Sequence, residues 1–177
     1  MNKPKYTTKQ IQDWFKGKIQ NIVSRFRTPA GIRKELVNRV ERRTDVTVIG
    51  KMYFFWYDPK HKDTLPQYDR FPLVFPIEAY PDGFLGLNLH YLSIDERMSL
   101  LGQLKKFSDD KTLTPNSRLA LSYQLLNSTR SIASSMRPCI KRYLFAHVRS
   151  PFIEVTADEW DKAAQLTVEN FVYNQKR

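Results

Sequence analysis

The side chains able to do acid–base or metal chemistry are few and scattered in this sequence. The three histidines, His61, His90 and His147, lie far apart, and no His-Glu-x-x-His pattern is present. His90 stands between Leu89 and Tyr91 in a strand-like run, so we expect a structural histidine there instead of a ligand. The sequence therefore predicts no metal site.

Two carboxylates, Asp69 and Glu78, could in principle form the acidic pair of a nuclease. Such a site also needs a lysine two residues after the second carboxylate, and Tyr80 occupies that position. The segment Gly83-Phe-Leu-Gly lacks the Lys and Ser or Thr of a phosphate-binding loop and leads into a strand. We predict no enzyme and no cofactor.

The single cysteine, Cys139, has Arg137 and Lys141 near it, and cations of this kind can lower a thiol pKa. No paired histidine is evident, so we expect Cys139 to pack as a small hydrophobic residue. One cysteine cannot form an intramolecular disulfide framework, which fits a reducing compartment. Because no apolar run approaches about 18 residues, we predict neither a membrane span nor a secretory signal.

The positive charge is concentrated in the first third of the chain. Of a formal net charge of +11, residues 1–51 hold 13 Lys and Arg against 4 Asp and Glu, and residues 52–177 hold 16 against 14. Nucleic acid is the first candidate partner, because each phosphate neutralised by Lys or Arg releases condensed counterions. An anionic membrane surface, an acidic protein surface and a solvated arm are the alternatives. The candidate phosphate contacts in this part are Lys9, Lys16, Lys18 and Arg25.

A second group of cations lies within 20 residues of the C-terminal half. A helix from Pro138 would place Lys141 and Arg142 on one face, with Arg149 just beyond its end. Phosphate contact and a solvated helix surface are both open interpretations. The group consists of Arg130, Arg137, Lys141, Arg142 and Arg149.

The elements that must position these cations begin with two basic helices. Over residues 8–27, apolar side chains recur at spacings of three and four, which predicts an amphipathic helix capped by Thr7 or Thr8 and ended by Pro29. A shorter helix is expected over residues 29–43. Together they form a basic helical arm, residues 1–46, ahead of a single domain, residues 47–177.

From residue 47 the composition shifts to β-branched and aromatic residues with turn signals, which indicates short antiparallel strands. We predict three, over residues 48–57, 73–78 and 84–92. Pro72 and Pro76 lack ladder donors, so the middle strand is expected to be short, at an edge, or bulged. The three strands form either an open sheet covered by helices or a small barrel.

The aromatic run from Tyr53 to Tyr57 could stack exposed bases, as in single-strand binding proteins. Alternation places Tyr53, Phe55 and Tyr57 on one face of a strand and Phe54 with Trp56 on the other. At least one face must be covered, so we favour packing over base stacking.

The C-terminal half returns to helix, and the fold class is therefore α+β. Helices are predicted over residues 94–107, 115–126 and 138–146, with a loop over 128–135 and a short extended piece over 152–155. Thr156 and Glu159 have capping-box spacing at the start of a last helix. Trp160, Ala163 and Ala164 then face the core.

Several long strings in the domain are unusual enough to compare with known families. They are Gly50-Lys-Met-Tyr-Phe-Phe-Trp-Tyr-Asp-Pro-Lys, Leu65-Pro-Gln-Tyr-Asp-Arg-Phe-Pro-Leu-Val-Phe-Pro, Asp82-Gly-Phe-Leu-Gly-Leu-Asn-Leu-His-Tyr-Leu, Arg118-Leu-Ala-Leu-Ser-Tyr, Arg137-Pro-Cys-Ile-Lys-Arg-Tyr-Leu and Glu159-Trp-Asp-Lys-Ala. In these strings the chain resembles the DNA end protector proteins of T4-like tailed phages. The resemblance covers roughly residues 50–165 and leaves the basic arm outside.

The resemblance implies a virion protein that sits on the end of the packaged double-stranded genome and blocks the host exonuclease that attacks free ends. It implies no catalytic residues. Among the matched residues, Arg137, Lys141 and Arg142 would suit phosphate contact by a DNA end binder. Portal, neck or tail proteins of the phage and a second copy of the chain are further expected partners, with the host cytoplasm as the location during assembly.

A competing function is that of a structural connector or plug in the phage neck, tail tube or baseplate. Its basic helices would then dock on acidic protein surfaces. Steep salt dependence of binding to duplex ends favours the DNA-capping function, whereas assembly with portal or tail proteins in the absence of DNA favours the connector.

Overall fold

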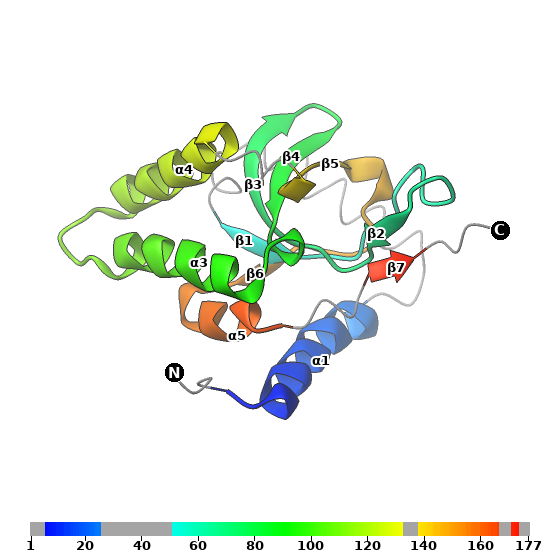
Figure 1. Ribbon diagram of the computed structural model, residues 1–177, viewed down its shortest axis with the longest axis horizontal. Coiled ribbons are helices and arrows are strands. Elements are labelled where there is room, and N and C mark those ends of the chain that lie inside the picture. Colours follow the sequence, from blue (N-terminus) through cyan, green and yellow to red (C-terminus); the bar gives the residue numbers. More distant parts are fainter. Residues whose placement is uncertain (1–5, 26–50, 133–137, 167–170, 174–177) are drawn as a thin grey trace.

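The computed structural model describes residues 6–25, 51–132, 138–166 and 171–173 of the chain. Within them the fold is α+β, as predicted, and its centre is a five-stranded antiparallel sheet. Helices α3, α4 and α5 lie together beside this sheet, and α1 lies next to α5 (Figure 1). A separate strand pair, β2 (Gln67–Asp69) and β7 (Phe171–Tyr173), lies to the right of the sheet in Figure 1, and helices α3, α4 and α5 lie to its left.

The central sheet has the strand order β5-β4-β3-β1-β6. Its three inner strands are the ones predicted: β1 (Met52–Phe54), β3 (Leu73–Tyr80) and β4 (Gly83–Asn88). The prediction of three strands is nevertheless wrong, because β5 (Ile140–Leu144) and β6 (Ile153–Val155) complete the sheet from the C-terminal half. These two strands form its edges, so the sheet is open and not a barrel.

Strand β5 replaces the helix predicted over residues 138–146 and is followed by a 3-10 turn, η3 (Phe145–His147). In its ladder with β4, Tyr143 pairs with Phe84 and Ile140 pairs with Leu87. The segment is too short for its apolar spacing to distinguish helix from strand. Pairing with β4, a strand distant in sequence, decides the conformation, as tertiary context commonly does for weak propensities.

The middle strand, β3, contains Pro76 and begins directly after Pro72. It is neither short nor at an edge, since it spans eight residues between β1 and β4. Its pairing with β4 shifts register between Pro76 and Glu78. The third expectation, a bulge, is therefore confirmed, and the irregularity accommodates a residue that cannot donate to the ladder.

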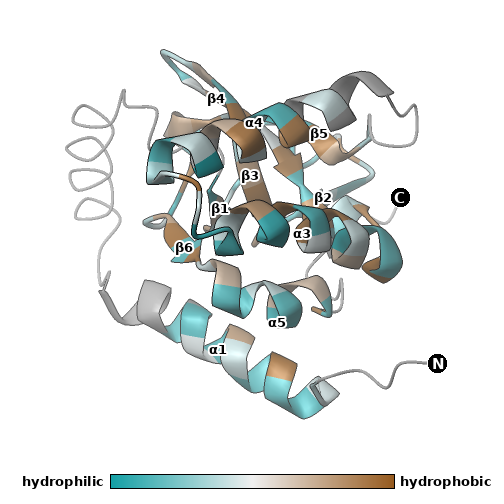
Figure 2. Ribbon diagram, turned by 90° about the vertical axis from the view of Figure 1, so that its left-hand side faces the viewer, coloured by the Kyte–Doolittle hydropathy of each residue, from teal (hydrophilic) through white to brown (hydrophobic). Residues whose placement is uncertain are grey.

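The sheet separates two hydrophobic clusters. The cluster under the helices includes Phe54, while the opposite cluster is largely aromatic and includes Tyr53, Phe55 and Tyr57. The predicted packing of this run is confirmed, except that Trp56 is 39% exposed. Figure 2 shows a brown, hydrophobic β3 at the centre of the molecule, with helix ribbons that alternate between teal and brown as amphipathic helices do.

Helices α3 (Ile94–Asp109) and α4 (Pro115–Ile132) extend the two predicted helices. Ser93 and Glu96 form a capping box at the start of α3. The predicted loop over residues 128–135 is wrong in its first part, because α4 continues to Ile132, and the rest lies outside the described residues.

The last helix begins as predicted. Thr156 and Glu159 form the capping box of a 3-10 turn, η4 (Ala157–Glu159), which continues directly into α5 (Trp160–Ala164). Trp160, Ala163 and Ala164 are buried, as expected from their spacing. The Trp160 indole packs against Phe75 with ring centroids 5.7 Å apart and donates from Nε1 to the Val155 carbonyl at 3.1 Å, so this helix is anchored to the sheet.

Helix α1 (Thr8–Arg25) is the described part of the basic arm. Thr7 caps it, because the Gln10 backbone N–H donates to Thr7 Oγ1 at 3.3 Å while the Thr7 N–H donates to Gln10 Oε1 at 2.8 Å. Ile11 is 6% exposed and belongs to the cluster under the helices. The helix predicted over residues 29–43 lies outside the described residues, and the domain boundary near residue 47 stays a prediction.

Candidate nucleic-acid interface

The exposed face of α1 carries two of the predicted phosphate contacts. Lys9 and Lys16 are seven residues apart, so they lie on the same face two turns apart. Both side chains are exposed, and neither makes an ion pair in the described part of the chain. These two ammonium groups are available to a polyanion.

Lys18 has a different environment, because it helps to attach α1 to the domain. Its Nζ donates to Glu159 Oε2 at 2.7 Å, and Trp14 Nε1 donates to Glu159 Oε1 at 3.1 Å. Burial acts to raise the pKa of Glu159, but the hydrogen bonds from Lys18 and Trp14 outweigh it and hold that pKa below its ordinary value. The charge of Lys18 is thus compensated within the molecule.

The cations of β5 do not share a face, which corrects the helical arrangement expected for them. Successive side chains of a strand point to opposite sides. Lys141 pairs with Gly86 of β4, and Arg142 pairs with Leu85. The strand therefore distributes these two charges over the two sides of the sheet edge.

Arg142 and Arg149 both have intramolecular partners. Arg142 forms an ion pair with Asp82, and its guanidinium carbon lies 3.7 Å from the centroid of the Tyr80 ring. Arg149 Nη1 donates to the Ala146 carbonyl at 2.8 Å, and its Nη2 lies 3.6 Å from Asp58 Oδ2. Ion pairs of this exposed kind contribute little to stability, so a phosphate could replace either carboxylate.

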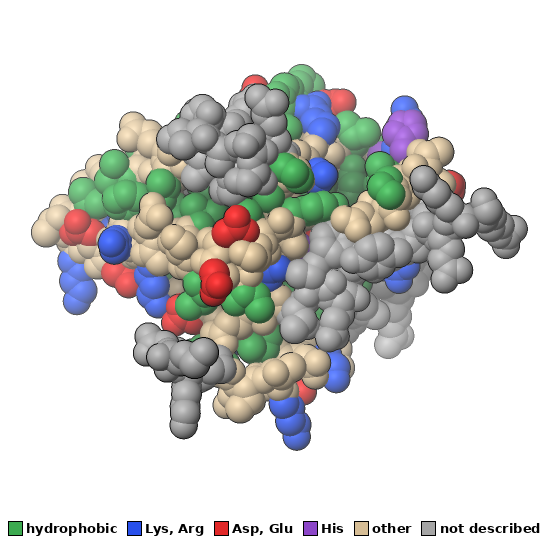
Figure 3. Space-filling view, in the orientation of Figure 1, with side chains coloured by type: hydrophobic (Ala, Val, Ile, Leu, Met, Phe, Trp, Pro, Cys, Tyr) green, Lys and Arg blue, Asp and Glu red, His purple; other side chains and the backbone are tan. Residues whose placement is uncertain are grey.

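Three other candidates are not placed by the structure. The side chains of Arg25 and Arg130, at the ends of α1 and α4, are outside what the structure describes. Arg137 also lies outside the described residues. Figure 3 shows Lys and Arg side chains interspersed with Asp and Glu over α3, so this face of the described molecule does not form a continuous basic surface.

Lys141 lines a pocket of about 440 Å³. The pocket lies between β5 on one side and, on the other, strand β2 and the segment that joins β1 to β2. Lys60 and His61 line it from the turn after β1, Tyr68 from β2, and Tyr91 from the 3-10 turn η1 (Leu89–Tyr91). The Lys141 ammonium lies 4.3 Å from the centroid of the Tyr91 ring. Burial lowers the pKa of Lys141, because removal from water disfavours the charged form.

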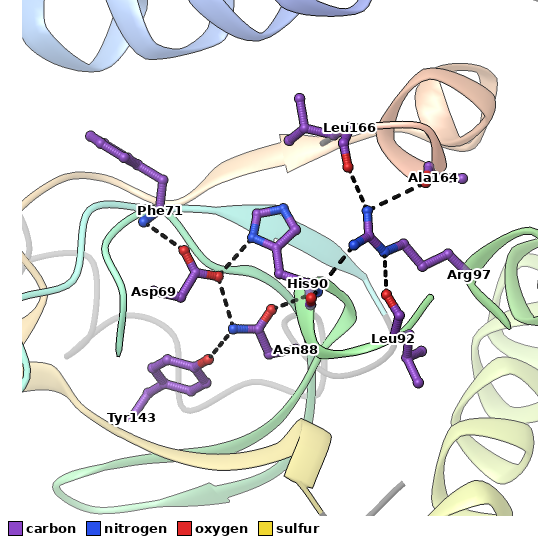
Figure 4. A network of polar contacts seen from close by, with 9 residues as sticks. All are labelled: Asp69, Phe71, Asn88, His90, Leu92, Arg97, Tyr143, Ala164 and Leu166. Carbon is purple, nitrogen blue, oxygen red and sulfur yellow. Dashed lines mark hydrogen bonds and ion pairs between the residues drawn. The ribbon is translucent and has the colours of Figure 1, made fainter. Parts of the chain in front are cut away.

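A buried polar network forms one wall of this pocket (Figure 4). Asp69 accepts from the Phe71 backbone N–H at 3.0 Å and from Asn88 Nδ2 at 3.0 Å, and it lies 2.7 Å from His90 Nδ1. Asn88 Nδ2 also donates to the Tyr143 hydroxyl at 3.0 Å. Burial, and next the charge of Asp69, raise the pKa of Tyr143 well above its ordinary value. Strands β2, β4 and β5 are thereby joined through side chains.

Arg97 extends the polar interior toward the helices, as Figure 4 also shows. It is 1% exposed, and its guanidinium donates to the carbonyls of Leu92 at 3.0 Å and Leu166 at 2.6 Å. Arg97 was not among the predicted functional residues, although its position three residues before Leu100 and four before Leu101 places a cation on the apolar stripe of α3. That position was a usable signal.

With this geometry described, the amino-acid sequence can be compared with known families. The family described as "Phage T4 terminal DNA protecting protein" has a sequence model that matches residues 2–177. The chain belongs to this family. The resemblance to DNA end protector proteins is thereby confirmed, and the family's function is the protection of terminal DNA. Neither the curated proteins nor the solved structures gave a match.

Membership in the terminal DNA protecting family corrects the extent of the resemblance. The strings of residues 50–165 leave the basic arm outside it, but the family match begins at residue 2. Helix α1, with Lys9 and Lys16 on its exposed face, is therefore part of the sequence that defines the family.

The described residues contain no group of three or more His, Cys, Asp or Glu side chains that could hold a metal ion. Cys139 is fully buried, and burial raises its pKa to about 11, so it packs as a hydrophobic residue, as predicted. His90 is structural, as predicted, and His147 Nδ1 lies 2.9 Å from the Asp58 carbonyl oxygen. No helix of the described ranges is long and apolar enough to span a bilayer.

Proposed function

We propose that this protein acts in the virion by occupying the end of the packaged duplex genome and excluding host exonuclease without a chemical step. The observation that carries the proposal is the family match over nearly the whole chain, the basic arm included. The charge distribution supports it, because residues 1–51 hold most of the excess of Lys and Arg. Binding energy alone is sufficient for protection, since an exonuclease must engage a free end.

Lys9, Lys16 and Lys141 are the strongest phosphate contacts in this proposal, because none of them has a carboxylate partner within the described residues. Arg142 and Arg149 follow, since each must first release an aspartate. Lys18 ranks below them because Glu159 holds it on the domain. Arg25, Arg130 and Arg137 are proposed on sequence grounds.

The test compares linear blunt duplex DNA with a closed circle of the same sequence. We expect the full-length protein to bind linear DNA more tightly and to protect it from a processive exonuclease. The affinity should fall steeply with salt, with a log-log slope of about 0.9 for each phosphate contacted. Equal affinity for circles and ends, or protection that survives high salt unchanged, would contradict end capping and favour the connector function.

We further propose that the protein assembles at the phage neck after synthesis in the host cytoplasm, next to portal or tail proteins and as one or more copies. A protein on the last base pairs of a packaged genome must lie where that end rests. Co-purification of the chain with portal or tail proteins from DNA-containing but not from DNA-free particles supports this placement. Recovery in equal amounts from both would indicate a connector.

The domain boundary near residue 47 is also a proposal, based on the change in charge and composition there. Limited proteolysis of the full chain should release a folded, soluble fragment of residues 47–177. Because Ile11 packs in the core, that fragment should be less stable than the whole chain, by up to about 3 kcal/mol. A fragment that cannot fold would make α1 an integral part of the domain.

A further inference from the structure

The pocket beside β5 has a lining that suits a nucleotide. Its volume of about 440 Å³ lies within the range of small-ligand sites. Aromatic side chains from separate elements reach it, including Tyr57 after β1, Tyr68 on β2 and Tyr91 on η1. Aromatic rings of this kind stack on nucleobases with little dependence on base identity.

Two of the cations that line this pocket have no carboxylate partner among the described residues, whereas a third, Arg142, is paired with Asp82. Lys141 is half-buried in its wall and has no carboxylate partner in the described ranges, in contrast to Lys62, which pairs with Asp58 at 2.9 Å. Lys60 is exposed on the turn after β1, and it too makes no ion pair with a described residue. An anion between these two ammonium groups would compensate both charges.

Among the described residues that line the pocket, Asp69 is the carboxylate, and its oxygens are engaged within the protein. Both of its oxygens already accept hydrogen bonds, one from the Phe71 backbone and the other from Asn88 and His90. The residue is 6% exposed, so its charge is held within the protein by three donors. The pocket thus combines a fixed polar wall, aromatic rings and two cations with no acidic partner.

We propose that this pocket receives the terminal nucleotide of a DNA strand, with its phosphomonoester between Lys141 and Lys60 and its base against Tyr68. The inference rests on the proposed end-capping function and names the group that is recognised. A phosphomonoester carries up to two negative charges, whereas an internal phosphodiester carries one. An internal nucleotide is also held by its neighbours on both sides, so a strand terminus enters such a pocket most readily.

The experiment uses the full chain and three blunt duplexes of one sequence, which carry 5′-phosphate, 3′-phosphate or only hydroxyl groups at their ends. We expect one phosphorylated duplex to bind roughly tenfold more tightly than the hydroxyl duplex, because its terminal phosphate makes a charge-assisted contact that the hydroxyl group cannot make. The duplex with the higher affinity identifies the strand terminus. Lys141→Gln and Lys60→Gln should each abolish this preference. Equal binding of all three duplexes overturns the inference.

The matched control is Lys106→Gln, which removes an exposed lysine on α3 outside the pocket lining and should leave the preference for phosphorylated ends intact. Because Lys141 is half-buried, the exposed Lys60 variant keeps the test valid if Lys141→Gln folds poorly. Thymidine 5′-monophosphate and thymidine are the small probes: the monophosphate should shift the NMR signals of Tyr68 and His61, and thymidine alone should not.

The two proposals fail in different ways. If hydroxyl and phosphorylated ends are protected equally and the pocket variants have no effect, end capping stands and the pocket inference fails. If linear DNA binds no better than circles, end capping fails, whereas binding of thymidine 5′-monophosphate would still identify the pocket as a nucleotide site.

Discussion

The two basic regions of this protein look alike in sequence and differ in structure. On α1, the helical period separates Ile11 in the core from Lys9 and Lys16 in solvent, so two charges remain available. On β5, the side chains of Lys141 and Arg142 point to opposite sides of the strand, and Arg142 forms an ion pair with Asp82. The number of cations in a segment therefore overstates the charge that a polyanion can meet, because neighbouring carboxylates are brought close only by the fold.

The largest expected effect is on the stability of the protein, through the anchoring of helix α5, which α1 contacts. Trp160→Ala should lower the free energy of unfolding by about 3 to 5 kcal/mol, because the indole is 7% exposed and packs on Phe75. Chemical denaturation measures this change. Trp56→Ala is the matched control, since Trp56 is 39% exposed and should cost less than about 1 kcal/mol. Similar losses for both variants would contradict the anchoring role of Trp160.

The next prediction compares the two regions directly through the salt dependence of binding to duplex ends. Lys9→Gln with Lys16→Gln should flatten the log-log slope by about 1.8, from two lost phosphate contacts. Arg142→Gln with Arg149→Gln should flatten it less, because both arginines already have aspartate partners. Gln keeps much of the aliphatic stem, so both proteins should stay folded. The reverse order of effects would place the main DNA contact at β5 instead of α1.

The smallest expected effect is a pH dependence of the contact between α1 and η4. The pKa of Glu159 is lowered in the folded protein, so its contribution to stability is present above the ordinary pKa of 4.5 and is lost as the pH falls through the lower, folded value. Acidification below about pH 4.5 should therefore increase hydrogen exchange in α1. Glu159→Gln should remove this pH dependence at a cost of roughly 1 kcal/mol at pH 7. Unchanged pH dependence in the variant would assign it to other carboxylates.

Local patterns in the sequence were sufficient wherever neighbouring residues determine the structure. The helical period of α1, the capping box of Thr156 and Glu159, and the alternation of Tyr53, Phe55 and Tyr57 were all predicted correctly. Each depends on residues within a few positions of one another, so each can be read without the rest of the chain. The family resemblance also came from contiguous strings, and the family match confirms it.

Contacts between distant segments were decided by the tertiary structure alone. Within the predicted helix of residues 138–146, Ile140–Leu144 form an edge strand because β4 provides a ladder partner, and that pairing separates Lys141 from Arg142. Asp69, Asn88 and Tyr143 come from three strands, and no spacing in the sequence indicates that they share hydrogen bonds. The amino-acid sequence thus determined the fold class, the helix starts and the excess of positive charge. Which charges are compensated, and where a pocket opens beside them, depends on side chains brought together by long-range pairing, whose geometry local periodicity does not encode.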